Sequence, residues 1–139
     1  MIVQFIDRFQ EIKLDLLEQF CQNEPESYED IFKQTLKMMF EDSEDSYSCD
    51  SETPDYERIT VIDDGDYQGT LVFVVASKSY QPSDYWVSTV DYGSCSGCDT
   101  FQAYSTFGDN PEESAPHMIT MALHMIEGMK KILWLLKVY

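Results

Sequence analysis

The chain has 139 residues, and 43% of them are hydrophobic, which is enough to build the core of one domain over residues 1–139. Its 9 basic and 26 acidic residues give a formal net charge of −17 at pH 7. Because like charges repel, this charge argues against direct binding to nucleic acid and to an anionic membrane surface. We therefore expect a charged partner to be a basic protein.

The N-terminal sequence lacks the basic segment of a signal peptide, and no apolar run approaches the length of a membrane span. We expect a cytoplasmic protein that does not bind a membrane. Its four cysteines are better interpreted as thiols or ligands than as a disulfide framework, because such frameworks are rare in reducing compartments. They are Cys21, Cys49, Cys95 and Cys98.

The first 40 residues have the pattern of two helices. An apolar residue recurs every three or four positions between Ile2 and Phe20, which predicts an amphipathic helix. Ser27 is a predicted N-cap for a second helix that extends to Met39, since its hydroxyl oxygen can accept a hydrogen bond from the first turn. Together the two segments predict a helical hairpin. The polar face of the first helix carries Asp7, Glu11, Asp15 and Glu18.

Acidic residues dominate positions 41–66, where eleven of them and the single Arg58 give a local charge of −10 (1 − 11). The first part, residues 41–57, has few apolar side chains and predicts a solvated acidic loop. Residues 58–62, 70–76 and 85–91 then have the β-branched and aromatic patterns of strands. These segments predict a three-stranded antiparallel meander.

A further apolar pattern, from Met118 to Leu136, predicts a long helix that begins near Ser114 and ends in a lysine-rich turn. Methionines along this helix are interpreted as core filler, and the sequence leaves open whether the helix also pairs with its copy in a homodimer. The order of segments predicts an α+β fold. In this fold an N-terminal helical hairpin and a three-stranded antiparallel meander precede a long C-terminal helix packed on the sheet.

Residues 92–100, YGSCSGCDT, place Cys95 and Cys98 among glycines after the last predicted strand. This segment resembles one found in small, uncharacterised proteins encoded by bacteriophages. The resemblance covers these residues alone. It implies a viral origin, and hence the cytoplasm of an infected bacterial host as the location, and it implies no activity and no functional residue.

The two-residue gap between Cys95 and Cys98 lets both thiolates reach one tetrahedral zinc ion. His117 and His124 are candidate further ligands, although seven residues is more than the usual spacing of two helical histidines on one metal. Since a second close pair of ligands is missing, we expect no cofactor and keep zinc as the alternative. Without a metal, the two cysteines are small thiols in a glycine-rich turn.

The sequence contains no nucleophile elbow and no phosphate-binding glycine loop, so it favours a binding protein over an enzyme and offers no catalytic residue. The acidic segment either provides solubility alone or binds a partner. We favour an acidic phage-type protein that inhibits a host nucleic-acid-binding or defence protein, with carboxylates that imitate nucleic-acid phosphates. The candidate partner-binding residues are Asp42, Glu44, Asp45, Asp50, Glu52, Asp55, Glu57, Asp63, Asp64 and Asp66.

The alternative is a metal-stabilised or small-ligand protein built around the Cys95/Cys98 turn, with a nucleotide as the candidate ligand. Its candidate pocket residues are Tyr85, Trp86 and Tyr92. Ionic strength separates the two hypotheses, because salt weakens contacts between exposed charges and has little effect on an aromatic pocket.

Overall fold

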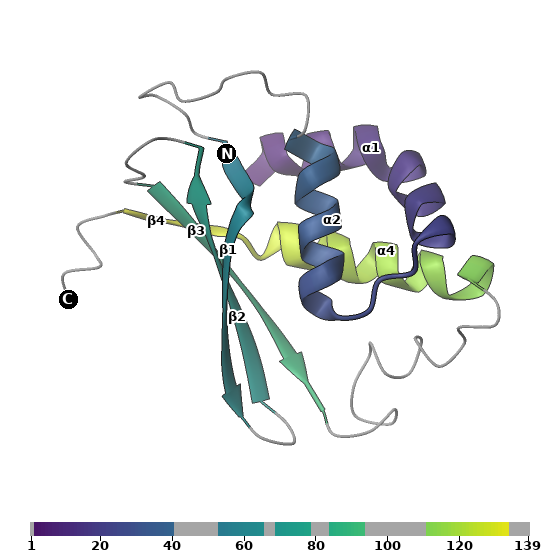
Figure 1. Cartoon of the computed structure of the whole chain (residues 1–139). Coiled ribbons are helices and arrows are strands. Elements are labelled where there is room, and N and C mark those ends of the chain that lie inside the picture. Colours follow the sequence, from purple (N-terminus) through teal and green to yellow (C-terminus); the bar gives the residue numbers. More distant parts are fainter. Residues whose placement is uncertain (1, 41–52, 66–68, 79–83, 94–110, 134–139) are drawn as a thin grey trace.

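The structure is a computed structural model, and it describes residues 2–40, 53–65, 69–78, 84–93 and 111–133. These residues contain three helices and a four-stranded antiparallel sheet, so the predicted α+β class is confirmed. None of the described helices is long and apolar enough to cross a membrane. In chain order the elements are α1 (Ile2–Gln22), α2 (Tyr28–Phe40), β1 (Pro54–Gly65), β2 (Gly69–Ser77), β3 (Asp84–Tyr92), α4 (Pro111–Glu127) and β4 (Lys130–Leu133) (Figure 1).

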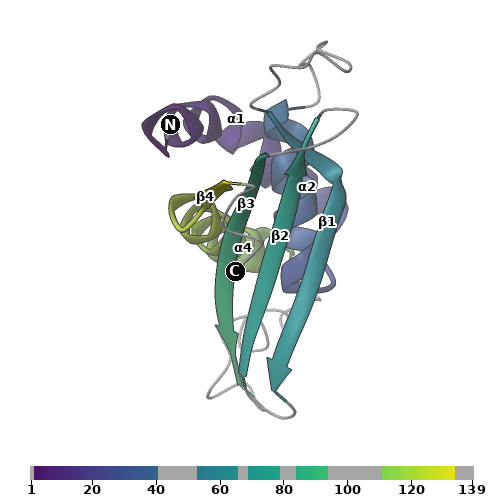
Figure 2. The same cartoon turned by 90° about the vertical axis from the view of Figure 1, so that its left-hand side faces the viewer.

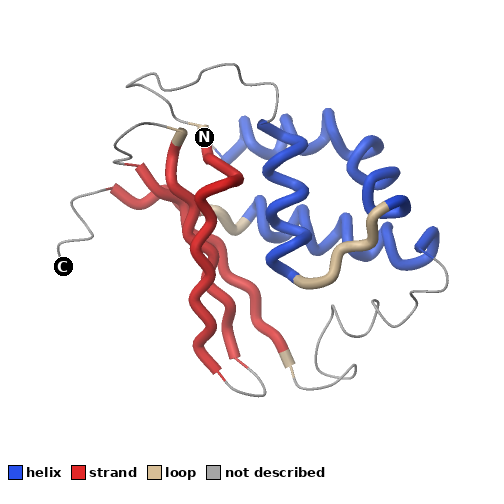
Figure 3. The backbone as a smooth tube through the Cα atoms, in the orientation of Figure 1, coloured by secondary structure: helices blue, strands red, loops and turns tan. Residues whose placement is uncertain are grey.

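The strands lie in the order β1-β2-β3-β4, and each neighbouring pair is antiparallel. Figure 3 shows the helices on one side of the sheet, and in Figure 2 the sheet faces the viewer with the helices behind it. One face of the sheet therefore packs on the helices. Val61 contacts this core, whereas the next residue, Ile62, points to the opposite face and is 51% exposed.

Strand β4 corrects the sequence prediction of one long C-terminal helix. The helix ends at Glu127, and residues 130–133 pair with the first half of β3, so the sheet has four strands rather than three. Gly128 is a weak helix former, and pairing with β3 satisfies backbone groups that a longer helix would have satisfied internally. The new strand is also attached through Lys131, whose Nζ lies 3.5 Å from Asp84 Oδ2.

Two other element boundaries differ from the prediction. Helix α4 begins at Pro111 rather than near Ser114. Proline is well suited to the first helical position, because an N–H there has no acceptor within the helix and its absence breaks no hydrogen bond. Strand β1 begins at Pro54, so the predicted acidic loop ends before residue 57. The pairing of β1 with β2 is irregular between Pro54 and Ile59.

The predicted N-cap of α2 is confirmed. Ser27 Oγ accepts a hydrogen bond from the Asp30 backbone N–H at 3.1 Å, and the Asp30 carboxylate accepts one from the Glu26 backbone N–H at 3.0 Å. At the other end of α2, Lys78 Nζ donates to the Phe40 carbonyl at 2.9 Å. Both ends of this helix thus have partners for backbone groups that a helix terminus leaves without intrahelical bonds.

Aromatic contacts join the helices to the sheet. The Phe5 ring of α1 lies 5.5 Å from the Phe40 ring of α2 and 6.1 Å from the Trp86 ring of β3, centre to centre. Phe32 of α2 lies 5.1 Å from Phe73 of β2. All five side chains are buried. The methionines of the C-terminal helix pattern, Met118, Met121, Met125 and Met129, are buried in the same core.

A buried hydrogen bond joins the end of α4 to β3. Ser88 Oγ donates to the Met125 carbonyl at 2.7 Å, and Ser88 is 1% exposed. The last turn of a helix leaves carbonyls without intrahelical partners. Those of His124 and Ile126 accept from the backbone that follows the helix, and Ser88 supplies the donor for the carbonyl between them.

We expect Ser88→Ala to lower the free energy of unfolding by about 1–3 kcal/mol, since it removes this donor from a buried carbonyl. Thr89→Val is the matched control, because it removes a hydroxyl from an exposed neighbour on the same strand and should change stability by less than about 0.5 kcal/mol. Urea denaturation followed by circular dichroism measures both. Equal stability of the two variants would contradict a structural role for this hydrogen bond.

Candidate functional site

The acidic residues predicted to bind a partner fall into two groups. Those outside the described residues are Asp42, Glu44, Asp45, Asp50, Glu52 and Asp66. Those within the described residues, Asp55, Glu57, Asp63 and Asp64, belong to β1. Since β1 is the first strand in the order of the sheet, this second group lies along a sheet edge.

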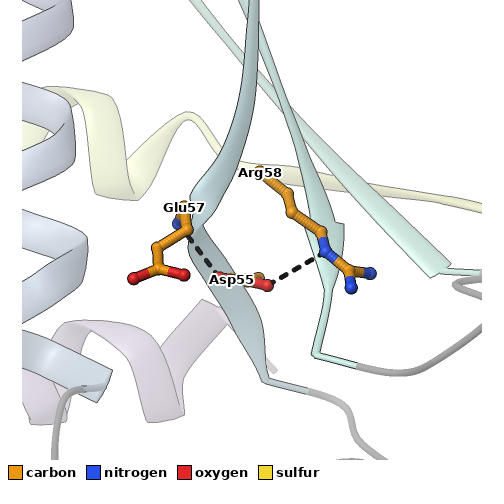
Figure 4. Close-up of polar contacts among 3 residues, drawn as sticks. All are labelled: Asp55, Glu57 and Arg58. Carbon is orange, nitrogen blue, oxygen red and sulfur yellow. Dashed lines mark hydrogen bonds and ion pairs between the residues drawn. The ribbon is translucent and has the colours of Figure 1, made fainter.

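Asp55 is engaged within β1 (Figure 4). Its Oδ1 accepts a hydrogen bond from the Glu57 backbone N–H at 3.0 Å, and its Oδ2 lies 3.3 Å from Arg58 Nε. A carboxylate bonded to the backbone two residues on forms an Asx-type turn, which agrees with the irregular pairing at this point. Asp55 therefore shapes the strand, whereas the Glu57 side chain is exposed to solvent.

Two exposed carboxylates are oriented by hydrogen bonds between strands. Tyr92 Oη donates to Asp63 Oδ1 at 2.5 Å, and Thr70 Oγ1 donates to Asp91 Oδ1 at 2.8 Å. These residues lie where β1 ends, β2 begins and β3 ends (Figure 1). This end of the sheet therefore presents fixed negative charge.

The aromatic residues of the alternative pocket are not brought together. Trp86 is 1% exposed and belongs to the core, and the adjacent Tyr85 points to the opposite face of the sheet because side chains alternate along a strand. Tyr92 packs against the edge of the core and bonds to Asp63. A small-ligand site formed by all three side chains has no support in this arrangement.

Helix α1 carries four exposed carboxylates, which we call the α1 acidic stripe. The sequence pattern placed them on a polar helix face but not in the candidate site. Because their spacing is three or four residues, they fall within an arc of about 80° and follow each other at about 4.5–6 Å along the helix axis. The stripe consists of Asp7, Glu11, Asp15 and Glu18.

Several basic side chains contact other groups of the protein. The Arg8 guanidinium carbon lies 5.0 Å from the centre of the Phe40 ring, and Lys78 Nζ lies 5.6 Å from the centre of a tyrosine ring. Arg58 and Lys131 pair with carboxylates. The described residues include 17 acidic and 8 basic residues, a balance of −9 (8 − 17). The helices and strands are therefore acidic even without residues 41–52.

The two histidines line one cavity of about 410 Å³ between α4 and β3. Strand β4 pairs only with residues 84–87 of β3, and the cavity lies beside the later part of β3. The sequence prediction missed this cavity because it depends on which strand lies next to α4. Its polar lining comprises His117, His124, Asp91, Thr89 and Thr120, and its apolar lining comprises Tyr28, Val90, Met121 and Met125.

The histidines are two helical turns apart, about 10.5 Å along the axis, which is more than the usual spacing of three or four residues for two histidines on one metal ion. Among the residues that the structure describes, no group of three or more histidine, cysteine, aspartate or glutamate side chains is positioned to hold a metal. The predicted zinc ligands Cys95 and Cys98 lie outside those residues.

Comparisons of this chain with protein-family models, with curated proteins and with solved structures find no match. The assignment of a function therefore depends on the charge and geometry of the chain's own residues.

We expect the melting temperature to rise as NaCl is raised from about 0.01 M to about 0.15 M, because the screening length falls from about 30 Å to about 8 Å and carboxylates repel each other less. A stripe variant, Asp7→Asn/Glu11→Gln/Asp15→Asn/Glu18→Gln, should respond less to salt. Scanning calorimetry measures both proteins. A melting temperature that falls with salt would show that attractive ion pairs, and not repulsion, dominate the surface.

Proposed function

We propose that this chain is an acidic binding protein that inhibits a host nucleic-acid-binding or defence protein by occupying its basic groove. The net charge of −17, with exposed carboxylates on helix α1 and on strand β1, is the observation that supports this proposal. The host is inferred from the resemblance of residues 92–100 to phage-encoded proteins.

Imitation of nucleic acid requires negative charges at regular intervals on a surface that keeps its shape. The α1 acidic stripe has an axial repeat of about 4.5–6 Å, of the same order as the about 3.4 Å rise between phosphates along one strand of nucleic acid. Glu57 and Asp63 add exposed carboxylates on β1. The acidic residues of positions 41–52 extend this charge along the chain. A basic groove built to bind phosphates would attract such surfaces.

Two variants of equal charge test the proposal and separate the surfaces. One is the stripe variant, and the other is a loop variant, Asp42→Asn/Glu44→Gln/Asp45→Asn/Asp50→Asn. Each changes the net charge from −17 to −13 (−17 + 4). Because both weaken the long-range field equally, both should slow association with a basic partner, by about threefold to tenfold at low salt. The variant that loses direct contacts should also dissociate faster.

The partner is first captured from host lysate at low salt and released at high salt, and the two rate constants are then measured by surface plasmon resonance. Thermal melting checks that each variant is folded. Unchanged association and dissociation rates in both folded variants would overturn the proposal.

The cavity between α4 and β3 supports a second candidate function, the binding of a small ligand such as a nucleotide. Its volume of about 410 Å³ is within the roughly 300–1,000 Å³ of ligand pockets, and it combines an apolar lining with several polar groups. Binding that is insensitive to salt and lost in His124→Ala would favour this function.

Stoichiometric zinc in elemental analysis would favour the metal-stabilised alternative at Cys95 and Cys98.

A further inference from the structure

An exposed leucine lies beside the α1 acidic stripe. Leu14 is 78% exposed, whereas the other exposed large apolar side chain of the described residues, Ile62, is 51% exposed on the sheet. Glu11 precedes Leu14 by three residues and Glu18 follows it by four, so each lies about one helical turn away on the same side of α1. The leucine is thus flanked by carboxylates.

Leu14 also borders a hollow of about 180 Å³ between α1 and α4. The two helices pack closely along each other, and Leu17, Pro116 and Ile119 supply most of the apolar lining of the hollow, with Lys13 and Thr120 beside them. The volume exceeds the about 30 Å³ of one water and is below the roughly 300 Å³ of small-molecule pockets. The hollow is therefore of a size to receive one protruding side chain.

Acidic residues also lie near the hollow on α4. Glu112 and Glu113 are exposed and precede Pro116 by four and three residues, so they lie about one turn from its apolar lining. Lys13 is the basic member of the lining. Exposed carboxylates of both helices thus lie within about one helical turn of the apolar lining, although none of them is part of it.

We propose that the hollow between α1 and α4 is the docking site for a basic amphipathic helix of the partner protein. An apolar side chain of that helix enters the hollow beside Leu14, and its lysines or arginines meet Glu11, Glu18 and Glu113. Two packed helices offer a groove into which a third helix can lie with its apolar face inward. This inference depends on the proposed function, since it names the surface and the partner chemistry of the same acidic protein.

Charge complementarity selects this occupant. A second copy of the chain would bring a net charge of −17 and the same carboxylates to the hollow, so repulsion opposes it. A neutral apolar helix would fill the hollow but would gain no attraction from the nearby carboxylates. A basic amphipathic helix satisfies both the apolar lining and the nearby carboxylates.

Two synthetic peptides of about 18 residues, roughly 27 Å as helices, test the proposal. Both carry the same number of lysines and arginines and a fluorescent label. One has leucines at i, i+4 and i+7, and the other has serines at these positions. Fluorescence anisotropy at low salt measures the affinity of each for the full chain, and amide chemical-shift changes in NMR spectra locate the contact.

We expect the leucine peptide to bind about tenfold more tightly than the serine peptide, the gain that corresponds to burial of one leucine side chain. Leu14→Ser should weaken the binding of the leucine peptide by about tenfold and leave the affinity of the serine peptide unchanged. Ile62→Ser is the matched control, since it makes the same change at an exposed position on the sheet, and should leave both affinities unchanged. Lys13→Gln should strengthen the binding of both peptides. Shift changes should concentrate in α1 and α4.

Equal effects of Leu14→Ser and Ile62→Ser, or shift changes centred outside α1 and α4, would overturn the docking site. The proposed function would still stand if both peptides bound equally and the stripe or loop variant weakened both. Absence of binding by either peptide at low salt would count against the docking site and the proposed function together.

Discussion

The packing of Phe5 against Phe40 and Trp86 joins the consecutive helices α1 and α2 to β3, which follows much later in the chain. Because the helices cover one face of the sheet only, this apolar layer holds the two layers of the fold together (Figure 2). It must do so against the repulsion of a net charge of −17. Basic side chains assist by contacting the interior elements, as Arg8 does on the Phe40 ring and Lys78 on the Phe40 carbonyl. Among the described residues, exposed carboxylates consequently outnumber exposed basic side chains, by 12 to 5.

This distribution makes the described surface predominantly acidic, and the exposed Leu14 adds an apolar side chain to it. A charged surface attracts any partner of opposite sign, so it raises the association rate more than it selects between partners. An apolar side chain in a desolvated contact adds affinity that salt does not screen. Leu14 and the hollow beside it are positioned to supply that second contribution. Long-range charge would bring the basic partner near, and the apolar contact would fix its orientation.

Local signals were sufficient for the elements whose stability is decided within the segment. The apolar period of α1, the Ser27 cap of α2 and the alternation of β3 each predicted their element correctly. Residues 130–133 were wrongly predicted as helix because their apolar pattern suits either structure, and pairing with β3 decides between them. The site was less predictable. The exposed carboxylates follow from sequence, but the role of Asp55 within β1 and the cavity and hollow beside α4 require the positions of neighbouring elements.

The central claim is that this protein and nucleic acid compete for one basic groove. The most direct test adds the protein to a complex of its captured partner with fluorescently labelled DNA and records the anisotropy of the DNA. The account predicts that the anisotropy falls to the value of free DNA as the protein is added, and that excess unlabelled DNA reverses the binding of the protein. Anisotropy that rises, because a ternary complex forms, would show that the two bind at separate sites and would contradict the account.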